Sequence, residues 1–558
     1  MKKTFVNLGF TVESHLDLTT EIMKKVFEKA SKCDHSEVDC FVCVISSHGL
    51  EKEGYDQTER KKSHHHYIVT NDGEIKTSDV LTYFRDDQCP SLKGKPKLFF
   101  IQACRSGKGN IMDSGHDIQI KNDDSTVPRI DLTANRGDQN TPDIPVTTPE
   151  QVTEVNDGFQ EVNEPVACFN DMLVMLAAPS GKIAFSRINA PERENPLLGG
   201  WLIRALSEVL VFETLNKEDP AESDREEQRD LLSLLVDATR NVAMTMTAKV
   251  QNTDVKSVPQ IIHKLTHDVY FPFVSRVSEI IDTTDALPIQ EEFEKLTISE
   301  SSTSDKSDEY KMDHPRRGKA LIISNREFNE ELELKSLEVS CNADVEKLQT
   351  AFKNLDFEVD TRTDLSSREI EELLDEISKE DHSDADCFVC VIISHGEEDT
   401  VFATDKSIEL KPLFDKFKGD RSKSLEGKPK LFFIQTCRGD EVDAGVQVNV
   451  ADAYGENARI VPETVWDYKV PPDADFLFAY ATVSGYKAYA NWGGSWFICE
   501  LMSALKEYAS GAAGAPAKDL LTIMTKVKFE ISQYNPQKQI PCTVSMLTKD
   551  VYFRPKSS

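Results

Sequence analysis

The sequence predicts two copies of one α/β fold in tandem, each built on a mostly parallel β-sheet flanked by helices. Two observations predict it: a long internal repeat, and short continuous apolar segments that alternate with amphipathic helical segments. Continuous apolarity is typical of parallel strands that are buried on both faces. The order strand–helix–strand is that of α/β domains, and 558 residues are enough for more than one of them.

The internal repeat is long and nearly identical in its two occurrences. Residues 39–49 return as residues 386–396, and residues 94–105 return as residues 427–438. The first pair of blocks lies 347 positions apart and the second pair 333, so the first copy carries 14 additional residues between its blocks. These additional residues fall in the charged stretch 51–66. No short fixed period is present, which excludes a solenoid.

The repeat divides the chain into two domains. We expect a first unit over residues 1–275 and a second unit over residues 316–556. Residues 276–315 are rich in Glu, Ser, Asp and Thr, which predicts an acidic flexible linker. Residues 108–164, inside the first unit, have a similar composition and few aromatic residues, and we expect a long acidic loop there.

The elements of the second unit follow from local patterns. We expect strands at residues 321–323, 387–393, 431–434 and 476–483, which are short runs rich in β-branched and aromatic residues. Between them, residues 370–377 have apolar side chains at the i, i+3, i+4, i+7 spacing of one helix face. Ser366 with Glu369 predicts a capping box at the start of that helix. Residues 496–505 predict a second helix.

Composition excludes several classes of function. The net charge is −31, which argues against binding to nucleic acid or to an anionic membrane surface. No apolar run approaches the roughly 18–20 residues that a membrane span needs, and no apolar segment follows the two lysines at the start, so we expect no secretory signal. We therefore expect a cytoplasmic protein whose 12 cysteines are reduced. Such cysteines are packing residues or nucleophiles.

A histidine and a cysteine recur at the same place in both copies. His395 and Cys437 each follow an apolar strand directly, as His48 and Cys104 do in the first unit. The carboxyl ends of neighbouring parallel strands form one crevice, where an imidazole can activate a thiol and then protonate a leaving amine. The backbone N–H groups of Gly396 and Cys437 are candidate donors to an oxyanion. Alternatively, the histidine merely ends a strand and the cysteine is a small buried hydrophobe; the recurrence favours catalysis.

These motifs resemble the signature of the caspase family. The likeness rests on Ser-His-Gly at 394–396 and Gln-Thr-Cys-Arg-Gly at 435–439, and it covers most of the second unit, from residues 310–313 to residues 539–547. The resemblance implies a six-stranded sheet and a cysteine endopeptidase that cuts after aspartate in apoptosis. It also implies a zymogen that is cut into a large and a small subunit.

Further expectations about partners follow from the same resemblance. The substrates are proteins or peptides, and no cofactor or metal is required. The protein is expected to pair through the last strand of its sheet, either with itself or with another caspase. The resemblance names His395 as the acid/base, Cys437 as the nucleophile and Gly396 as an oxyanion donor.

The pocket for the substrate aspartate departs from the family pattern. The resemblance implies two arginines and one glutamine, and the glutamine matches Gln435, with Gln102 in the first unit. One arginine position falls on Ala490, and the other falls near Leu337 or Glu338. Two lysines, Lys335 and Lys487, are substitutes by position. A lysine is a point charge and does not reproduce the two-pronged geometry of a guanidinium.

The first unit departs further. Its residues 5–10 match residues 352–357, so the first strand of the fold and the loop after it have no counterpart. Ser106 stands where the signature has glycine, and Arg187 lies one place beyond the second pocket position. The last strand, expected at residues 260–264, is more polar than its counterpart, which disfavours self-pairing and favours pairing with the second unit.

Smaller features complete the sequence-based predictions. For His64, His65 and His66 we favour a solvated loop over a metal site. Four aspartates are candidate cleavage sites: Asp305 and Asp308 between the units, and Asp443 and Asp452 within the second unit. Residues 440–443 resemble a preferred executioner cleavage sequence, although a structural loop is the favoured interpretation there.

Two alternatives stay open at this stage. The first is a catalytically impaired caspase homologue that regulates an active caspase by heterodimerisation, which the missing arginines favour. The second is that the first unit owes its missing strand to a mispredicted start. Whether the units pair within one chain or between chains is also open.

Overall fold

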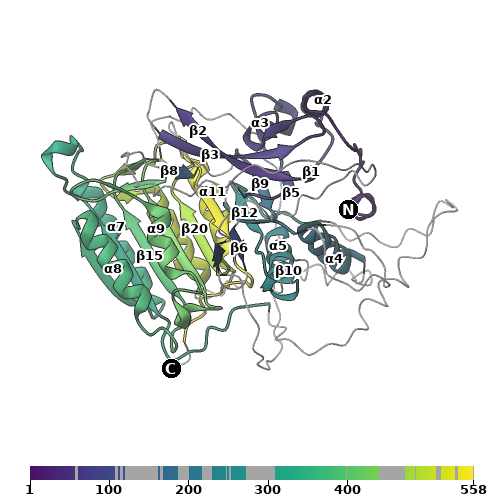
Figure 1. Ribbon diagram of the computed structural model, residues 1–558. Coiled ribbons are helices and arrows are strands. Elements are labelled where there is room, and N and C mark those ends of the chain that lie inside the picture. The colour runs from purple at the N-terminus through teal and green to yellow at the C-terminus, as the bar shows by residue number, and fades with distance from the viewer. Residues whose placement is uncertain are drawn as a thin grey trace, which may run out of the picture.

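The computed structural model describes most of both units (Figure 1). The described residues are 1–56, 61–106, 111–113, 117–119, 161–163, 168–185, 200–215, 229–246, 248–250, 253–271, 308–397, 399–438, 472–483, 485–509, 517–534 and 538–556. The predicted linker lies mostly outside this set, and the predicted loop over 108–164 enters it only through three short strands, β6 (Ile111–Asp113), β7 (Asp117–Gln119) and β8 (Glu161–Asn163).

One ten-stranded sheet runs through both units. Four strands come from the first unit, in the order β1 (Phe41–Ser46), β5 (Lys97–Gln102), β9 (Met172–Leu176) and β12 (Gln260–His263). Six come from the second, in the order β23 (Cys542–Ser545), β20 (Phe476–Tyr480), β19 (Lys430–Gln435), β15 (Phe388–Ile393), β13 (Lys319–Ser324) and β14 (Glu358–Thr363). Among the described residues, the second unit contributes six strands to this sheet and the first contributes four, whereas six were expected for each copy.

The pairing within each unit is mostly parallel. Within the ten-stranded sheet, the second unit has one antiparallel pair, β20 with β23, and the first unit has one, β9 with β12. Strand β15 is buried along its whole length, as its unbroken apolar sequence predicts. The first unit has no strand at residues 11–16, the counterpart of β14. Strand β14 pairs only with β13, and without a β13 this segment has no neighbour to bond to.

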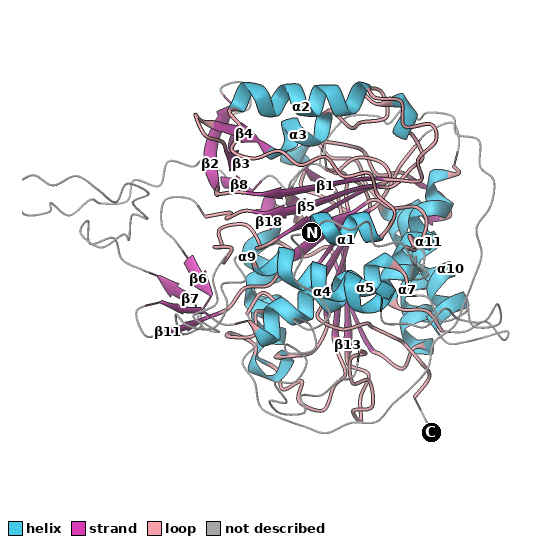
Figure 2. Cartoon of the chain, turned by 90° about the vertical axis from the view of Figure 1, so that its right-hand side faces the viewer, coloured by secondary structure: helices cyan, strands magenta, loops and turns pink. Residues whose placement is uncertain are grey.

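Helices cover both faces of the sheet (Figure 2). One face carries α2 (Thr20–Lys32), α3 (Thr77–Thr82), α8 (Ser367–Lys379) and α9 (Leu410–Phe414). The other carries α1 (Lys2–Asn7), α4 (Trp201–Leu215), α5 (Leu231–Arg240), α7 (Glu338–Asn354), α10 (Trp496–Ala504) and α11 (Leu520–Ser532). On this second face one apolar core runs without a break from the first unit into the second. Among the described residues, no helix is long and apolar enough to cross a membrane.

The helices predicted from the sequence are confirmed. Helix α8 contains the apolar stripe, and its N-terminus has the expected capping box, in which Ser366 and Glu369 exchange hydrogen bonds. Helix α10 begins at Trp496 as predicted and continues into a π-helical turn, Leu505–Ala509. Helix α5 has the same ending, with a π-helical turn at Asn241–Thr245.

The remaining strands form small sheets beside the main one. The first unit has β2 (Gly49–Asp56), β3 (Lys61–Val69) and β4 (Glu74–Lys76), with β8 against β3, and separate pairs β6–β7 and β10 (Ala248–Val250) with β11 (Thr253–Val255). The second unit has β16 (Gly396–Glu397), β17 (Thr400–Phe402) and β18 (Ser407–Glu409), and the pair β21 (Ala490–Asn491) with β22 (Gly494–Ser495). The additional residues of the first unit thus lengthen a hairpin.

The prediction of a solvated loop at the three histidines is wrong for His66. His64 to His66 all lie in β3, and His66 is buried. Residues alternate between the two faces of a strand, so every second residue of β3 points inward, and His66 and Ile68 are the buried ones. Among the described residues, no group of His, Cys, Asp and Glu side chains is arranged to hold a metal ion.

The two units pair with each other inside one chain. Strand β12 of the first unit lies antiparallel to β23 of the second, with Ile262 opposite Val544. The polar last strand of the first unit therefore pairs with the second unit, as its sequence favoured. Since β12 and β23 bond to each other, the last strand of each unit is already occupied.

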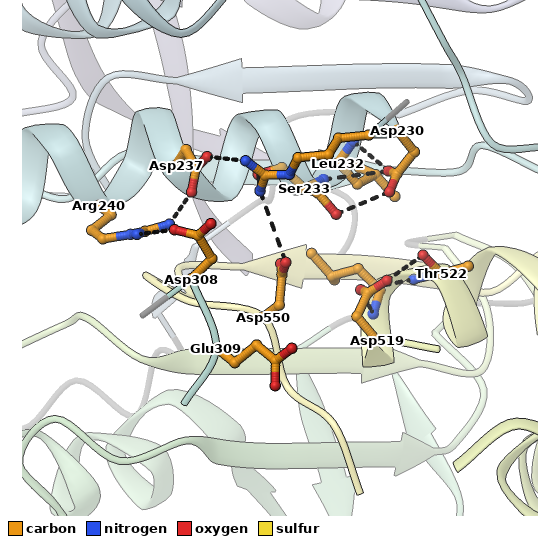
Figure 3. A network of polar contacts seen from close by, with 12 residues as sticks. Asp230, Leu232, Ser233, Asp237, Arg240, Asp308, Glu309, Asp519, Thr522 and Asp550 are labelled. Carbon is orange, nitrogen blue, oxygen red and sulfur yellow. Dashed lines mark hydrogen bonds and ion pairs between the residues drawn. The ribbon is translucent and has the colours of Figure 1, made fainter. Parts of the chain in front are cut away.

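A polar network beside this strand pair joins the units (Figure 3). Arg240 of α5 lies 2.8 Å from Asp308 and also pairs with Asp237, whose other oxygen is 2.5 Å from Arg229. Arg229 in turn lies 3.9 Å from Asp550 of the second unit. Helix α5 of the first unit thereby contacts the segment that leads into the second unit and its C-terminal end.

Aspartates cap α5 and α11, which are equivalent helices of the two units, at this junction. Asp230 accepts hydrogen bonds from the backbone of α5, and Asp519 does the same for α11. Burial, together with the nearby Asp230 carboxylate, raises the pKa of Asp519 to about 7. Burial also raises the pKa of Asp550 well above its usual value, with Asp519 as the next contributor.

Candidate active site

His395 stands at the carboxyl edge of the sheet in the second unit. It comes two residues after the end of β15, and its Nε2 lies 2.8 Å from the backbone oxygen of Lys335. Its ring packs against Phe328, with ring centres 5.1 Å apart. A carbonyl oxygen only accepts hydrogen bonds, so Nε2 carries the proton and donates it. The other ring nitrogen, Nδ1, is thereby left as an acceptor, which is the state that a general base requires.

Cys437 stands at the same edge on the next strand. Ile393 of β15 pairs with Gln435 of β19, and the histidine and the cysteine each lie two residues beyond this pair. The Cys437 thiol is half-buried, with Sγ 3.7 Å from the backbone oxygen of Ala488. Adjacent strands are about 4.8 Å apart, so the two side chains start from neighbouring points on one edge.

Gly396 lets the backbones after the two strands approach closely. A Cβ atom at this position would lie 2.7 Å from Cβ of Thr436 and 3.0 Å from the backbone oxygen of Cys437. Only glycine fits that spacing without displacing backbone. The backbone after β15 therefore contacts the backbone after β19, next to His395 and Cys437.

Gln435 is a buried polar residue two positions before Cys437. Its side chain is 7 % exposed, and its amide oxygen Oε1 has no hydrogen-bond partner among the described residues. An unpaired buried acceptor costs about 1–3 kcal/mol, which a bound donor would recover. The amide therefore has capacity left for a ligand.

The two arginine positions of the pocket hold other residues. Leu337 is half-buried and caps the start of α7, which begins at Glu338, and Ala490 is exposed in β21. Lys335 has an exposed side chain and contributes its backbone oxygen to His395. The other substitute by position, Lys487, is half-buried.

Sequence analysis missed an aromatic cluster that begins one residue after Ala488. The ring of Trp496 lies between Tyr489 and Tyr534, with ring centres 5.0 and 4.8 Å away. The backbone N–H of Tyr489 donates to Oε1 of Gln539 at 2.7 Å, and the buried Tyr489 hydroxyl has no hydrogen-bond partner in the described part of the chain. The sequence did offer one signal for this cluster: Tyr489 lies between two alanines at residues 488–490, where the family pattern has an arginine.

The first unit repeats the outline of the site. Cys104 is half-buried with Sγ 3.4 Å from the backbone oxygen of Ala184, and burial raises the pKa of its thiol. A Cβ on Gly49 would lie 2.5 Å from the backbone oxygen of Cys104, so the close approach is conserved between the copies. His48 is exposed, and no described segment takes the place of the Lys335 carbonyl.

The pocket of the first unit is closed around Gln102. Its Oε1 accepts a hydrogen bond from the backbone N–H of Leu202 at 3.0 Å, and its Nε2 donates to the backbone oxygen of Phe185 at 3.3 Å. A Cβ on Gly200 would lie 2.1 Å from the Gln102 amide carbon. The start of α4 therefore occupies the space that a ligand of Gln102 would need.

The lengthened hairpin of the first unit adds polar contacts behind Cys104, which sequence analysis did not find. His66 engages the backbone oxygen of Cys104 at 3.0 Å and the hydroxyl of Thr77 at 2.8 Å. Burial and then the nearby Arg105 lower the pKa of His66 to about 3, so it is neutral. Arg105 is buried and pairs with Glu51 at 2.9 Å. In the second unit the corresponding Arg438 pairs with Asp399 at 2.7 Å.

Of the candidate cleavage sites, only Asp308 lies in the described part of the chain. Its carboxylate pairs with Arg240, and its backbone oxygen accepts a hydrogen bond from Asp550 at 2.8 Å. These contacts must break before a protease can take up this segment. Asp305, Asp443 and Asp452 lie outside the described residues, as does Arg187.

Comparison with known proteins gives a consistent result. The family model described as "Caspase domain" matches twice, over residues 1–270 and 317–552. The chain is 39 % identical to Caspase-7 of Gallus gallus over 256 residues, which is 44 % of this chain and 80 % of that protein. It is 39 % identical to Caspase-3 of Mus musculus and 40 % identical to Caspase-3 of Mesocricetus auratus, each over 276 residues, which is 47 % of this chain and 94 % of those proteins.

Proposed function

This chain belongs to the caspase family of cysteine peptidases, and on that premise we propose that its second unit is the catalytic one and its first unit a built-in partner. The second unit would hydrolyse peptide bonds with Cys437 as nucleophile and His395 as acid and base. The first unit would supply the neighbouring strand that a caspase-like sheet pairs with. Both roles then reside in one chain.

The observation that carries the proposal is the hydrogen bond between His395 and Lys335. It fixes the imidazole so that its unprotonated nitrogen is available, at the strand edge where Cys437 also stands. His48 of the first unit has no such partner among the described residues. The two units therefore differ in how the histidine is held.

The chemistry follows from these positions. His395 would take the proton of the Cys437 thiol, and the thiolate would attack the scissile carbonyl carbon to form a tetrahedral oxyanion. The backbone N–H groups of Gly396 and Cys437 support the developing charge. Collapse would expel the amine, which takes the proton back from His395, and water would then release the acyl group from the sulfur by the same route.

The test is peptide hydrolysis by the purified full chain. Cys437→Ala should reduce turnover by at least about 10³-fold, because the nucleophile is removed. Cys104→Ala is the matched control and should leave turnover unchanged. Equal turnover by the two variants would contradict the assignment of catalysis to the second unit.

We extend the proposal to cleavage after aspartate, which is supported by the family and by Gln435. The two guanidinium groups that would neutralise the substrate carboxylate have no counterpart at Leu337, Glu338 or Ala490. Each charge-assisted hydrogen bond that is lost is worth about 1.5–3 kcal/mol. We therefore expect a preference for aspartate over asparagine of about tenfold or less, measured as the ratio of kcat/KM for two otherwise identical peptides.

We also infer a zymogen that acts in the cytoplasm during apoptosis and is processed at aspartates. Asp452 would separate the large and small subunits of the second unit, and Asp305 or Asp308 would separate the units. Digestion of the Cys437→Ala chain with an active executioner caspase, followed by N-terminal sequencing, tests the sites. The expected new ends are Ala453, Lys306 and Glu309. Absence of all three would remove this part of the proposal.

The second candidate function is regulation of an active caspase by heterodimerisation, which the missing pocket arginines favour. In the structure, the last strands β12 and β23 pair with each other, so a partner caspase would have to displace one of them. Lack of turnover on any peptide, combined with tight binding to an active caspase, would favour this candidate.

A further inference from the structure

Helix α7 of the second unit carries a buried acid that the proposed mechanism does not use. Asp344 faces β22, against which α7 packs, and it is only 1 % exposed. Burial of a carboxylate is costly unless specific partners compensate for the loss of water. The compensating partner of Asp344 is Ser495, which lies in the hairpin formed by β21 and β22.

Both carboxylate oxygens of Asp344 bind this hairpin. Oδ1 accepts the backbone N–H of Ser495 at 2.9 Å, and Oδ2 accepts the Ser495 hydroxyl at 2.6 Å. Three residues further along α7, Nζ of Lys347 donates to the backbone oxygen of Gly493. Residues three apart in a helix lie on the same face, so the two side chains hold neighbouring points of the hairpin.

Gly494 allows the hairpin to approach α7 closely. Its φ is 113°, which side chains rarely permit, and a Cβ atom there would lie 2.4 Å from Oδ1 of Asp344. Any larger residue at this position would push the carboxylate and the hairpin apart. The hairpin and the helix therefore fit each other at the carboxylate of Asp344.

The hairpin leads directly to the residue that contacts Cys437. Ala490 of β21 pairs with Ser495 of β22, the residue that Asp344 binds. Two positions before Ala490 is Ala488, whose backbone oxygen lies 3.7 Å from Sγ of Cys437. Where the hairpin lies therefore determines where the backbone beside the thiol lies.

The start of α7 leads to the residue that holds His395. The helix begins at Glu338, three residues after Lys335, whose backbone oxygen accepts the hydrogen bond of His395. The backbone N–H of Cys341 donates to the backbone oxygen of Leu337 at 3.0 Å, which joins this segment to the first turn. Helix α7 therefore connects the histidine side of the candidate site to the cysteine side.

We propose that Asp344 is a positioning residue, which holds the β21–β22 hairpin against α7 and thereby keeps residues 488–490 in place for peptide binding beside Cys437. This inference rests on the proposed function of the second unit. Among the described residues, Asp344 bonds to neither His395 nor Cys437, so its effect passes through Ser495. A displaced hairpin weakens the binding of substrate, and the effect should fall on KM more than on kcat.

An asparagine can make the same two contacts as Asp344. Its amide oxygen accepts the Ser495 N–H, and its amide nitrogen donates to the Ser495 hydroxyl. Burial raises the pKa of Asp344 to about 6, so the site disfavours the charged form and suits a neutral side chain of the same shape. The charged group that faces Asp344 is Lys347, and the thiols nearby are Cys341 and Cys499.

The test compares variants of the full chain by peptide hydrolysis. Asp344→Ala should raise KM by at least about tenfold and lower kcat by less than about threefold, whereas Asp344→Asn should keep KM within about threefold of the wild-type value. Glu346→Ala, on the exposed side of α7, removes the same charge and should leave KM unchanged. Equal losses for Asp344→Ala and Asp344→Asn, or an unchanged KM for Asp344→Ala, would overturn the proposal.

Hydrogen exchange tests the hairpin itself without turnover. The amides of Tyr489 and Trp496 donate to Gln539 and to the backbone oxygen of Tyr489, and neither bonds to Asp344. Both should lose protection by at least about tenfold in Asp344→Ala and keep it in Asp344→Asn. Unchanged protection in Asp344→Ala would contradict the positioning role. If the wild-type chain hydrolyses no peptide, the proposed function fails, and this exchange experiment still decides whether Asp344 holds the hairpin.

A further variant keeps the test independent of whether Asp344→Ala folds. Lys347→Met removes only the hydrogen bond to Gly493. It should shift KM and the protection of the same two amides in the same direction, by a factor of about two to five. No change in either quantity would show that α7 does not hold the hairpin.

Discussion

Gln102 and Gln435 occupy the same place in the two units and have opposite surroundings. The first unit satisfies both ends of the Gln102 amide from within, through Leu202 and Phe185, whereas in the second no described residue bonds to the amide oxygen of Gln435. The same contrast holds at the histidines, since His395 is held by Lys335 and His48 is exposed. A shared motif therefore does not give shared local surroundings. What differs is which neighbouring segment closes over the motif.

The comparison of the two units assumes that they fold together cooperatively. The strand pair β12–β23 between them predicts this. Ile262 lies at the centre of that pair and is buried between Val544 and Val174. Ile262→Asp would bury an unpaired carboxylate, and we expect a loss of about 3–5 kcal/mol in the free energy of unfolding, together with loss of turnover. Chemical denaturation measures it. The control Ile22→Asp, on the exposed face of α2, should cost less than about 0.5 kcal/mol.

The units also differ in their charged groups at this interface. Lys528 of α11 is fully buried, and its Nζ lies 3.3 Å from Nε2 of His263 in the first unit. The equivalent position in α5 is Thr239. Burial lowers the pKa of Lys528 to about 7. Between pH 7 and pH 10.5 the unfolded chain holds a proton that the folded chain lacks, so the free energy of unfolding rises with pH in this window.

Lys528→Met should remove that dependence. We expect the wild-type chain to gain up to about 1.4 kcal/mol of stability per pH unit relative to the variant from pH 7 to pH 9, and the variant to be the more stable of the two at pH 7. Denaturation curves at three pH values measure it. Lys526→Met, on the exposed side of the same helix, is the control. Parallel pH profiles for wild type and Lys528→Met would contradict the lowered pKa.

The contrast between the two glutamines predicts that substitution of one affects activity and substitution of the other affects stability. Gln435→Ala should lower kcat/KM by about 10- to 30-fold, because a substrate contact is lost, with little change in stability. Gln102→Ala should leave kcat/KM unchanged and reduce the free energy of unfolding by about 1–2 kcal/mol, since the Leu202 N–H loses its acceptor. Peptide hydrolysis and denaturation on both variants decide it, and the reverse pattern would exchange the roles of the units.

The smallest expected difference lies in the aligned helices α8 and α2. Ser366 and Glu369 form a reciprocal capping box, whereas Thr19 accepts a single hydrogen bond from Ile22 at 3.3 Å. We expect Ser366→Ala to cost about 1 kcal/mol and Thr19→Ala about 0.5 kcal/mol. Denaturation curves at one pH compare the free energies of unfolding of the two variants. A larger loss of stability for Thr19→Ala than for Ser366→Ala would show that the reciprocal capping box gives no additional stability.

Much of this fold was predictable because the determining patterns are local or are repeated. The strands around residues 388–393 and 430–435, the helix capped at Ser366, and the division into two units all follow from periodicity and from the internal repeat. The pairing of the first unit with the second was predictable from the polar character of residues 260–264. The smaller number of strands in the first unit was also predictable in part, because its sequence has no counterpart of the first strand of the second unit.

The sequence by itself determined two caspase-like units, the strands that end at the histidine and cysteine, and the loss of the pocket arginines, because these depend on residue type and spacing. Only the tertiary structure decided that the start of α4 fills the pocket at Gln102, that His66 is buried behind Cys104, and that β12 bonds to β23 of the same chain. Each of these contacts joins segments distant in sequence. Whether such segments meet is decided by the packing of helices and loops against the completed sheet.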